Sequence, residues 1–165
     1  MFWRLTQKDY ARNSPRGNQE MLNALVASGN PTGLLAYDGS RVVGWCGVSP
    51  RSSFGRLEHS KFFPATTDRL TWSIVCFFIH RKWRKQAVAR RLLEAALRYA
   101  GEHGAQVVEA YPVDPEGGKI PPKEGYPGLL GMFLAAGFRQ VAVTQARSGG
   151  HFRSIVQYEL PEDYR

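Results

Sequence analysis

The chain has 165 residues, of which 43% are apolar and 22% charged, a composition typical of a globular protein with a substantial core. It contains no apolar stretch near the ~20 residues that cross a bilayer, no signal-peptide run near its start, and no metal-ligand spacing among its histidines and cysteines. We therefore expect one cytoplasmic domain, residues 1–165, with no bound metal and no membrane partner. The formal net charge of +8 indicates an anionic ligand or partner.

The N-terminal third predicts short elements separated by turns. Residues 2–5 are mostly aromatic and apolar and predict a first strand. Residues 18–28 carry apolar side chains at helical spacing and predict a helix. Residues 33–37 and 41–49 flank Asp38-Gly39, a two-residue sequence typical of a β-hairpin.

The centre of the chain predicts a buried strand followed by an amphipathic helix. Residues 72–80 form a nine-residue apolar and aromatic run, which indicates a strand covered on both faces. Residues 88–100 place apolar side chains every three or four positions. Six of the eleven residues from Arg81 to Arg91 are Lys or Arg. The helix start also lacks a Ser, Thr or Asp cap, so this turn suits a pyrophosphate, unless it is simply solvated surface.

The C-terminal third continues the alternation of strands and helices. Residues 106–111 predict a strand and residues 129–134 a helix. Residues 138–144 and 152–160 flank Ser148-Gly149-Gly150 and predict a terminal hairpin. The resulting order, β-α-β-β-β-α-β-α-β-β, indicates a mixed α/β fold.

Two long segments lack a clear period. Residues 50–71 are interpreted either as a wall of an acceptor pocket or as disordered chain, with a short helical turn at residues 56–59. Residues 112–125 are rich in Pro and Gly and predict a loop.

The basic turn resembles the acyl-CoA signature of the GNAT superfamily of N-acyltransferases. The sequence from Arg84 to Ala89, RKQAVA, followed by a Leu pair, is similar to the family's Arg/Gln-x-x-Gly-x-Gly/Ala on a strand–turn–helix. Residues 126–138 are similar to a second family segment that closes on Gly-Phe. The element order also resembles the family's from end to end, which implies a central twisted mixed sheet flanked by helices.

The resemblance implies acetyl-CoA as co-substrate, with the strand pairing with the pantetheine arm and the turn holding the pyrophosphate. Two positions depart from the family pattern. The central glycine is Ala87, which is acceptable if the residue keeps helical dihedrals. The tyrosine that often protonates the departing thiolate is Phe133, which cannot donate a proton. The cofactor-binding residues implied are Phe77, Phe78, Ile79, Arg84, Lys85, Gln86, Ala87, Val88 and Ala89.

Three residues are candidates for proton transfer. Tyr126 opens the helix that carries the family tyrosine, and Tyr111 ends the strand expected to diverge from the cofactor strand, so both are candidate acids. Glu109 is a carboxylate inside an apolar strand and is the candidate base, since burial raises a carboxyl pKa. The alternatives are packing roles for the tyrosines and a salt bridge or outward-facing position for Glu109.

We expect an N-acetyltransferase that moves an acetyl group from acetyl-CoA to a primary amine by direct attack, because no activated nucleophile is evident. The acceptor is open between a small molecule and a peptide amine, and a homodimer through the terminal strands is also open. One alternative is a CoA-binding module without activity, which Ala87 and Phe133 favour. The other is a nucleic-acid binder that uses the basic turn, although the sequence shows no zinc-finger, RRM or helix-turn-helix signature.

Overall fold

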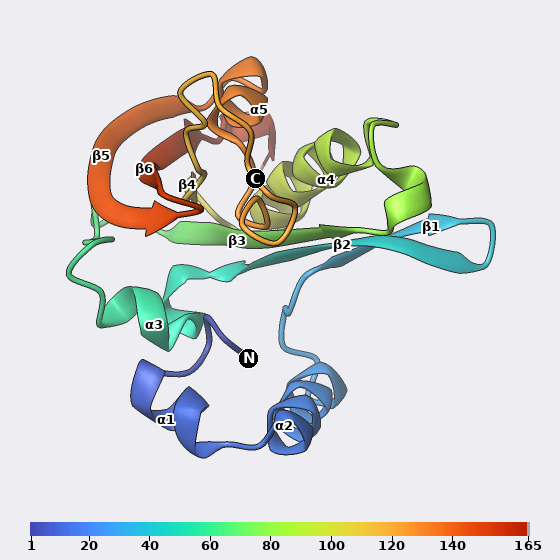
Figure 1. Cartoon of the computed structure of the whole chain (residues 1–165). Helices are drawn as coiled ribbons and strands as arrows, with labels where there is room; N and C mark the ends of the chain where they lie inside the picture. Colours follow the sequence, from blue (N-terminus) through green and yellow to red (C-terminus); the bar gives the residue numbers. More distant parts are fainter. Residues whose placement is uncertain (165) are drawn as a thin grey trace.

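The computed structural model describes residues 1–164 and is built on a six-stranded sheet in the order β1-β2-β3-β4-β6-β5 (Figure 1). Strands β3 and β4 are parallel, and every other neighbouring pair is antiparallel. This arrangement confirms the predicted mixed α/β class. The strands are β1 (Leu34–Asp38), β2 (Arg41–Pro50), β3 (Thr71–Ile79), β4 (Val107–Ala110), β5 (Arg139–Ser148) and β6 (His151–Glu159).

Both predicted hairpins are present. Strands β1 and β2 turn at Gly39-Ser40, one residue later than the predicted Asp38-Gly39, and Gly39 has a φ of 58°; β5 and β6 turn at Gly149-Gly150, with φ values of 56° and 84°. Glycine adopts these left-handed dihedrals without the steric cost of a side chain, so the turn residues fix the register of each hairpin.

Helices lie on both sides of the sheet. Figure 1 shows α4 and α5 on one side and the N-terminal helices α1, α2 and α3 on the other. None of the described helices has the length and apolarity needed to cross a membrane. The helices are α1 (Gln7–Arg12), α2 (Pro15–Ala27), α3 (Gly55–Glu58), α4 (Val88–Glu102) and α5 (Leu130–Ala135), with 3-10 turns η1 (Arg51–Ser53), η2 (Arg81–Trp83) and η3 (Glu162–Tyr164).

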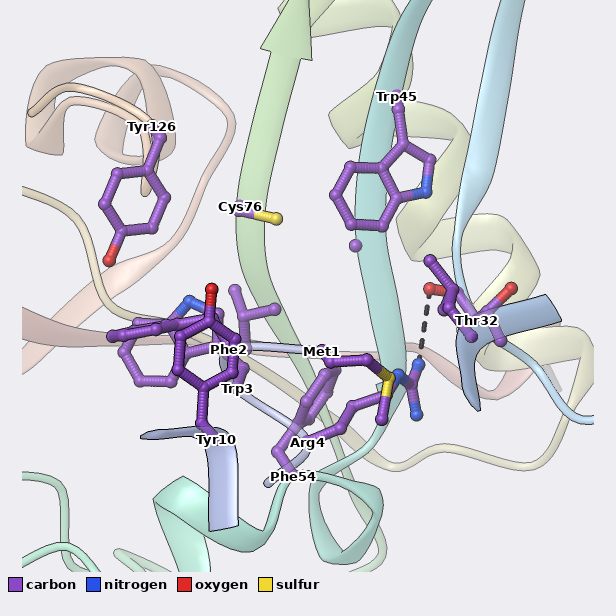
Figure 2. Close-up of a pocket in the computed structure, with 13 residues that line it drawn as sticks. Met1, Phe2, Trp3, Arg4, Tyr10, Thr32, Trp45, Phe54, Cys76 and Tyr126 are labelled. Carbon is purple, nitrogen blue, oxygen red and sulfur yellow. Dashed lines mark hydrogen bonds between the residues drawn. The ribbon is translucent and has the colours of Figure 1, made fainter. Parts of the chain in front are cut away.

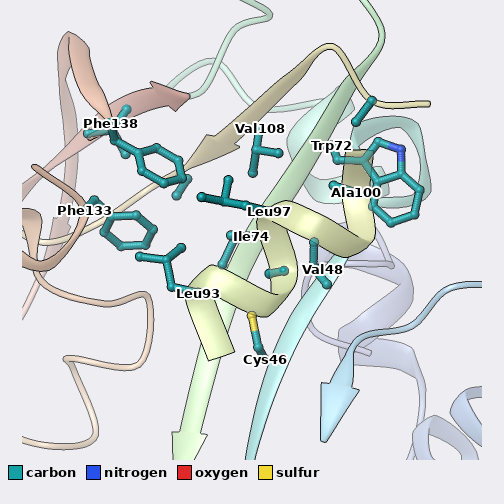
Figure 3. Packing of buried hydrophobic residues seen from close by; sticks show 14 of the residues in the cluster. Cys46, Val48, Trp72, Ile74, Leu93, Leu97, Ala100, Val108, Phe133 and Phe138 are labelled. Atoms are coloured by element: carbon teal, nitrogen blue, oxygen red, sulfur yellow. The ribbon is translucent and has the colours of Figure 1, made fainter. Parts of the chain in front are cut away.

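The main core lies between the sheet and α4 (Figure 3). The predicted apolar face of α4 is confirmed, since Leu93, Ala96 and Ala100 are fully buried against the strands. From the sheet, Cys46, Val48 and Ile74 meet this face, and each is also fully buried. Burial of each large aliphatic side chain contributes about 1.5–3 kcal/mol, so this layer holds α4 against β2 and β3.

A second core lies on the opposite face of the sheet, under the N-terminal segment. It includes Trp3, Phe54, Leu57, Phe63, Val75, Tyr111 and Ile155. The helical turn predicted at residues 56–59 is present as α3, whose Leu57 is 1% exposed and anchors the 50–71 segment in this core.

The structure contradicts one prediction for the N-terminal segment and adds two features that were not predicted. Residues 2–5 form a turn and not a strand, because the Arg4 and Leu5 N–H groups both donate back to the Met1 carbonyl. Helix α1 was not predicted, although Thr6 caps it through the Asp9 N–H. The apolar face of α2 is not core, since α2 contains no buried residue. Trp3 is buried beside the sheet and not as part of it, whereas Phe2 is exposed.

Candidate active site

Strand β3 loses one neighbour half-way along its length. It pairs with β4 only as far as Ile74 and Ala110, yet β3 continues to Ile79. The chain leaving β4 soon reaches Pro112, which has no N–H to continue a ladder. The second half of β3 therefore presents a free edge.

Two hydrogen bonds organise that edge. The Phe77 N–H donates to the Tyr126 carbonyl at 2.7 Å, which fixes residue 126 beside β3. The Ile79 carbonyl accepts from Nε of Arg84 at 3.1 Å, which turns the Arg84 side chain back towards the same edge. A loop residue and a cation are thus held against the strand where β4 is missing.

A cavity of about 670 Å³ opens along this edge, and we call it the edge cavity. Of the nine residues implied to bind the cofactor, Phe77, Phe78, Ile79, Arg84 and Ala89 line it. Gln86 and Val88 line a smaller neighbouring hollow of about 250 Å³, and Lys85 and Ala87 line neither. The opposite wall of the edge cavity comes from Pro122, Lys123, Gly125, Tyr126, Gly128, Leu129 and Met132.

The basic turn has an unusual backbone. Lys85 and Ala87 have φ values of 61° and 57°, in the left-handed region that side chains disfavour. The condition under which Ala87 would be acceptable, helical dihedrals, is therefore not met. Left-handed residues interspersed in a tight turn point backbone N–H groups inward and form an anion-binding concavity.

The start of α4 completes this concavity. Ala87 is the N-cap residue of α4 and makes no side-chain capping bond, so the first N–H groups of the helix lack a side-chain acceptor. The helix dipole and the surrounding cations favour a negative group there. The residues present thus fit a pyrophosphate at the mouth of the edge cavity.

A second cavity, of about 410 Å³, lies on the face of the sheet that carries the N-terminal segment (Figure 2). We call it the aromatic pocket. Its lining residues are Met1, Phe2, Trp3, Arg4, Tyr10, Leu22, Thr32, Trp45, Gly47, Phe54, Val75, Cys76 and Tyr126.

A β-bulge builds the floor of the aromatic pocket. Gly47 pairs with Cys76 and Val48 with Ile74, so Val75 is an extra residue in β3. The bulge breaks the alternation of side chains, and both Val75 and Cys76 line the pocket. Burial raises the pKa of the Cys76 thiol to about 11, against opposing effects of the Gly47 backbone and Arg4.

Tyr126 lines both cavities. Figure 2 shows its ring at the side of the aromatic pocket, with the hydroxyl turned towards the space above Trp3. Burial raises the pKa of this hydroxyl, although the nearby Arg153 guanidinium opposes the shift. At neutral pH the hydroxyl of this shared lining residue is therefore protonated.

A sequence model of the acetyltransferase (GNAT) family matches residues 1–117. The chain belongs to this family. It is accordingly an acyl-CoA-dependent N-acyltransferase with acetyl-CoA as co-substrate, as the resemblance implied. Among curated proteins, none matches the chain in sequence.

Solved GNAT structures share the fold of this acyltransferase. The ribosomal-protein-alanine N-acetyltransferase of Brucella melitensis is 17% identical with a TM-score of 0.58, over 90% of this chain and 80% of that one. YncA of Salmonella typhimurium, solved with its cofactor acetyl-CoA, is 14% identical with a TM-score of 0.56, over 91% and 76%. A further acetyltransferase is 16% identical with a TM-score of 0.59, over 95% and 87%. At identities this low, the likeness shows a shared fold alone.

Two of the three candidate catalytic residues lie outside both cavities. Glu109 is fully buried, accepts from Gln157 at 3.0 Å and from the Tyr111 hydroxyl at 3.0 Å, and pairs with Arg51 at 3.4 Å. The Tyr111 hydroxyl also contacts Ser73 at 2.9 Å, and burial raises its pKa strongly. In this acyltransferase both residues belong to a closed polar network beneath β3 and β4, while Tyr126 faces open space.

Phe133, at the position of the usual family tyrosine, is fully buried and packs against Phe77 and Phe138. Sequence reasoning missed Trp3 and Arg4, which line the aromatic pocket. Their only sequence signal was the density of aromatic and basic residues at the start of the chain, and the sequence analysis interpreted that segment as a strand.

Proposed function

We propose that the protein transfers an acetyl group from acetyl-CoA to a primary amine by direct attack, with Tyr126 as the general acid. The observation that carries this proposal is that Tyr126 lines both the edge cavity and the aromatic pocket. The donor fits the edge cavity and the acceptor amine fits the aromatic pocket, so the two reacting groups meet beside the Tyr126 hydroxyl.

The binding roles follow from the edge cavity and the basic turn. The backbone N–H groups of residues 85–89, with Arg84 beside them, would hold the pyrophosphate. The free edge of β3 from Phe77 to Ile79 would pair with the amide groups of the pantetheine arm, as a missing strand would. Two groups of this edge already have a partner: the Phe77 N–H donates to Tyr126, and the Ile79 carbonyl accepts from Arg84.

Acetyl-CoA supplies the activated acyl carbon, and the chain supplies position and a proton. The neutral amine nitrogen forms the new bond to the acyl carbon, the carbon–sulfur bond breaks, and the sulfur leaves with the bonding electrons. The Tyr126 hydroxyl donates a proton to that sulfur, and solvent takes the proton that the amine loses. A thiol with a pKa near ~8.5 is a fair leaving group, so one donor is sufficient help.

The donor site is tested by titrating acetyl-CoA into the wild type and the Arg84→Glu variant, with thermal unfolding and calorimetry as readouts. At ~100 times the dissociation constant, bound ligand stabilises the wild type by about 2.7 kcal/mol. We expect Arg84→Glu to lose most of this gain. Arg98→Glu, the same charge change at an exposed position on α4, is the matched control and keeps it. Equal stabilisation of both variants would contradict the assignment.

A further inference from the structure

The aromatic pocket has the size and wall of a site for one small apolar molecule. At about 410 Å³ it lies within the range of ligand pockets, and its aromatic lining comes from Phe2, Trp3, Tyr10, Trp45, Phe54 and Tyr126. The apolar stripe of α2 contributes Leu22, which explains why that stripe is not part of a closed core.

Trp3 contributes its ring to this pocket and not its hydrogen-bond donor. Its side chain is only 6% exposed, and its indole Nε1 is buried without a hydrogen-bond partner. Because that atom is closed off from solvent, a ligand in the pocket would meet Trp3 as apolar wall.

Arg4 is the one charged side chain in the lining of the aromatic pocket. All hydrogen bonds of its side chain within residues 1–164 come from Nη2, to the carbonyls of Pro31 and Thr32 and to Oγ of Ser49. Nη1 and Nε are therefore left for a ligand. No carboxylate among the described residues forms an ion pair with Arg4.

The same lining contains no Asp or Glu. A protonated amine would enter without a counter-ion and next to a guanidinium, and both the apolar wall and that charge lower the pKa of a bound amine. The pocket therefore favours the neutral amine, which is the form that attacks a thioester, and it supplies this form without a general base. A lysine-like amine with a pKa of ~10.4 is disfavoured relative to an α-amine with a pKa near ~8.

We propose that the acceptor is an amino-acid-like amine, with an apolar or aromatic body in the aromatic pocket and a carboxylate bound by Arg4. This inference rests on the proposed transfer reaction and names its substrate class. Nε and Nη1 of Arg4, which have no partner among the described residues, would hold the carboxylate, and the aromatic wall would hold the body beside it.

The test compares matched pairs of amines at fixed acetyl-CoA, with release of the CoA thiol as the readout. Each pair consists of an amino acid and the same amine without its carboxylate: phenylalanine with phenethylamine, tryptophan with tryptamine, leucine with isopentylamine. We expect kcat/KM to favour the amino acid by at least about tenfold in one pair or more, the amount that one charged hydrogen bond supplies. Lysine and spermidine are expected to be poor acceptors.

Two variants locate the effect. Arg4→Gln removes the charge and is expected to raise KM for the amino acid more than for its partner amine. Arg12→Gln, an exposed cation on α1 outside the pocket, is the matched control and leaves the ratio as in the wild type. Stabilisation of every variant by acetyl-CoA confirms that it is folded.

The outcomes separate this inference from the proposed reaction. If the amines without a carboxylate are the better substrates in all pairs, or if lysine is preferred, the inference is wrong and the reaction stands. If acetyl-CoA binds and no amine is acetylated, the reaction fails, and calorimetry with N-acetylphenylalanine decides the pocket. Binding that Arg4→Gln abolishes supports the inference, and no binding to the wild type overturns it.

Discussion

At the scale of single residues, the most informative position is Ala87. The family resemblance located it as the place of a glycine, and the structure gives the reason, since its φ of 57° lies in the left-handed region. A residue with a Cβ at such a dihedral costs about 1–2 kcal/mol. Sequence reasoning could identify the substitution but not the strain, because strain depends on a backbone dihedral that only the folded turn sets.

We expect Ala87→Gly to raise the free energy of unfolding by about 1 kcal/mol, because glycine adopts the same dihedral without steric conflict. It should also tighten acetyl-CoA binding, since a methyl group leaves the concavity. Denaturant unfolding and calorimetry measure the two effects. Ala89→Gly is the matched control: Ala89 lies inside α4, where glycine is the poorer residue, and we expect a loss of stability. A destabilised Ala87→Gly variant would contradict the role of strain.

Tyr126 is the second decisive residue. We expect Tyr126→Phe to lower kcat by about 10²-fold while acetyl-CoA binding is retained, because the variant loses only the hydroxyl and keeps the carbonyl bonded to Phe77. Steady-state rates and calorimetry check the two halves of this prediction. An unchanged kcat would show that solvent protonates the leaving sulfur.

The pH dependence gives a separate check on Tyr126. Burial raises its pKa above the ordinary tyrosine value of ~10, so the hydroxyl stays protonated at neutral and moderately alkaline pH. Because the protonated form is the donor, activity should fall only as the pH rises through this elevated pKa. The rising limb, set by deprotonation of the amine, lies at lower pH. In Tyr126→Phe the alkaline fall should be absent, and a fall that persists would assign it to another group.

At the scale of elements, prediction succeeded where a long apolar run or a sustained hydrophobic period identifies the element. Strand β3 and helix α4 were both predicted within two residues, since a nine-residue apolar run and a three-to-four spacing have few competing interpretations. Residues 2–5 were misassigned because four residues carry no period, and aromatic side chains suit a strand or a packed turn equally. Helix α1 had a usable signal in Thr6 and Asp9, three residues apart, as in a capping box.

The lining residues of the two cavities also differ in how far they could be predicted from the sequence. Five residues of the edge cavity follow from a local motif on one strand and turn, so the sequence located them. The aromatic pocket joins the N-terminal segment to β2, β3 and residue 126, which are distant in the chain. No local pattern reports such contacts, because they arise only when the N-terminal segment packs beside the sheet.

The polar network around Glu109, on β4, leads to a prediction about stability. We expect Glu109→Ala to lower the free energy of unfolding by about 3 kcal/mol, because it removes the buried carboxylate that pairs with Arg51 and accepts from the Tyr111 hydroxyl, and leaves Arg51 only its more exposed partner Glu58. Glu58→Ala removes the exposed partner of Arg51 and is the control, with an expected loss below about 1 kcal/mol. Thermal and urea unfolding measure both.

The Glu109→Gln variant, which keeps the shape of the side chain, distinguishes a stabilising role of Glu109 from a catalytic one. If Glu109 only stabilises the network, kcat of the folded variant stays within a few-fold of the wild type. A loss of 10²-fold or more, with full acetyl-CoA binding, would assign Glu109 as the general base despite its position outside both cavities.

At the scale of the whole molecule, the two cavities that we propose for the donor and the acceptor share one lining residue. The edge cavity lies beside α4 and the aromatic pocket beneath the N-terminal segment, and Tyr126 borders both. The loss of pairing after Ile74 and the bulge at Val75 together make this possible. One irregularity opens an edge for the donor, and the other turns two side chains towards the acceptor.

This architecture predicts a sequential kinetic mechanism. Direct attack needs both substrates bound at once, whereas a covalent route would need a nucleophile in the pocket. The nearest thiol there, Cys76, is poorly suited because burial raises its pKa to about 11 and keeps it protonated at neutral pH. Initial rates at varied acetyl-CoA and amine should therefore give intersecting double-reciprocal lines, and the chain incubated with acetyl-CoA alone should keep its unmodified mass. Parallel lines together with an acetylated Cys76 would overturn direct transfer and make the bulge that points Cys76 into the pocket a device for covalent catalysis.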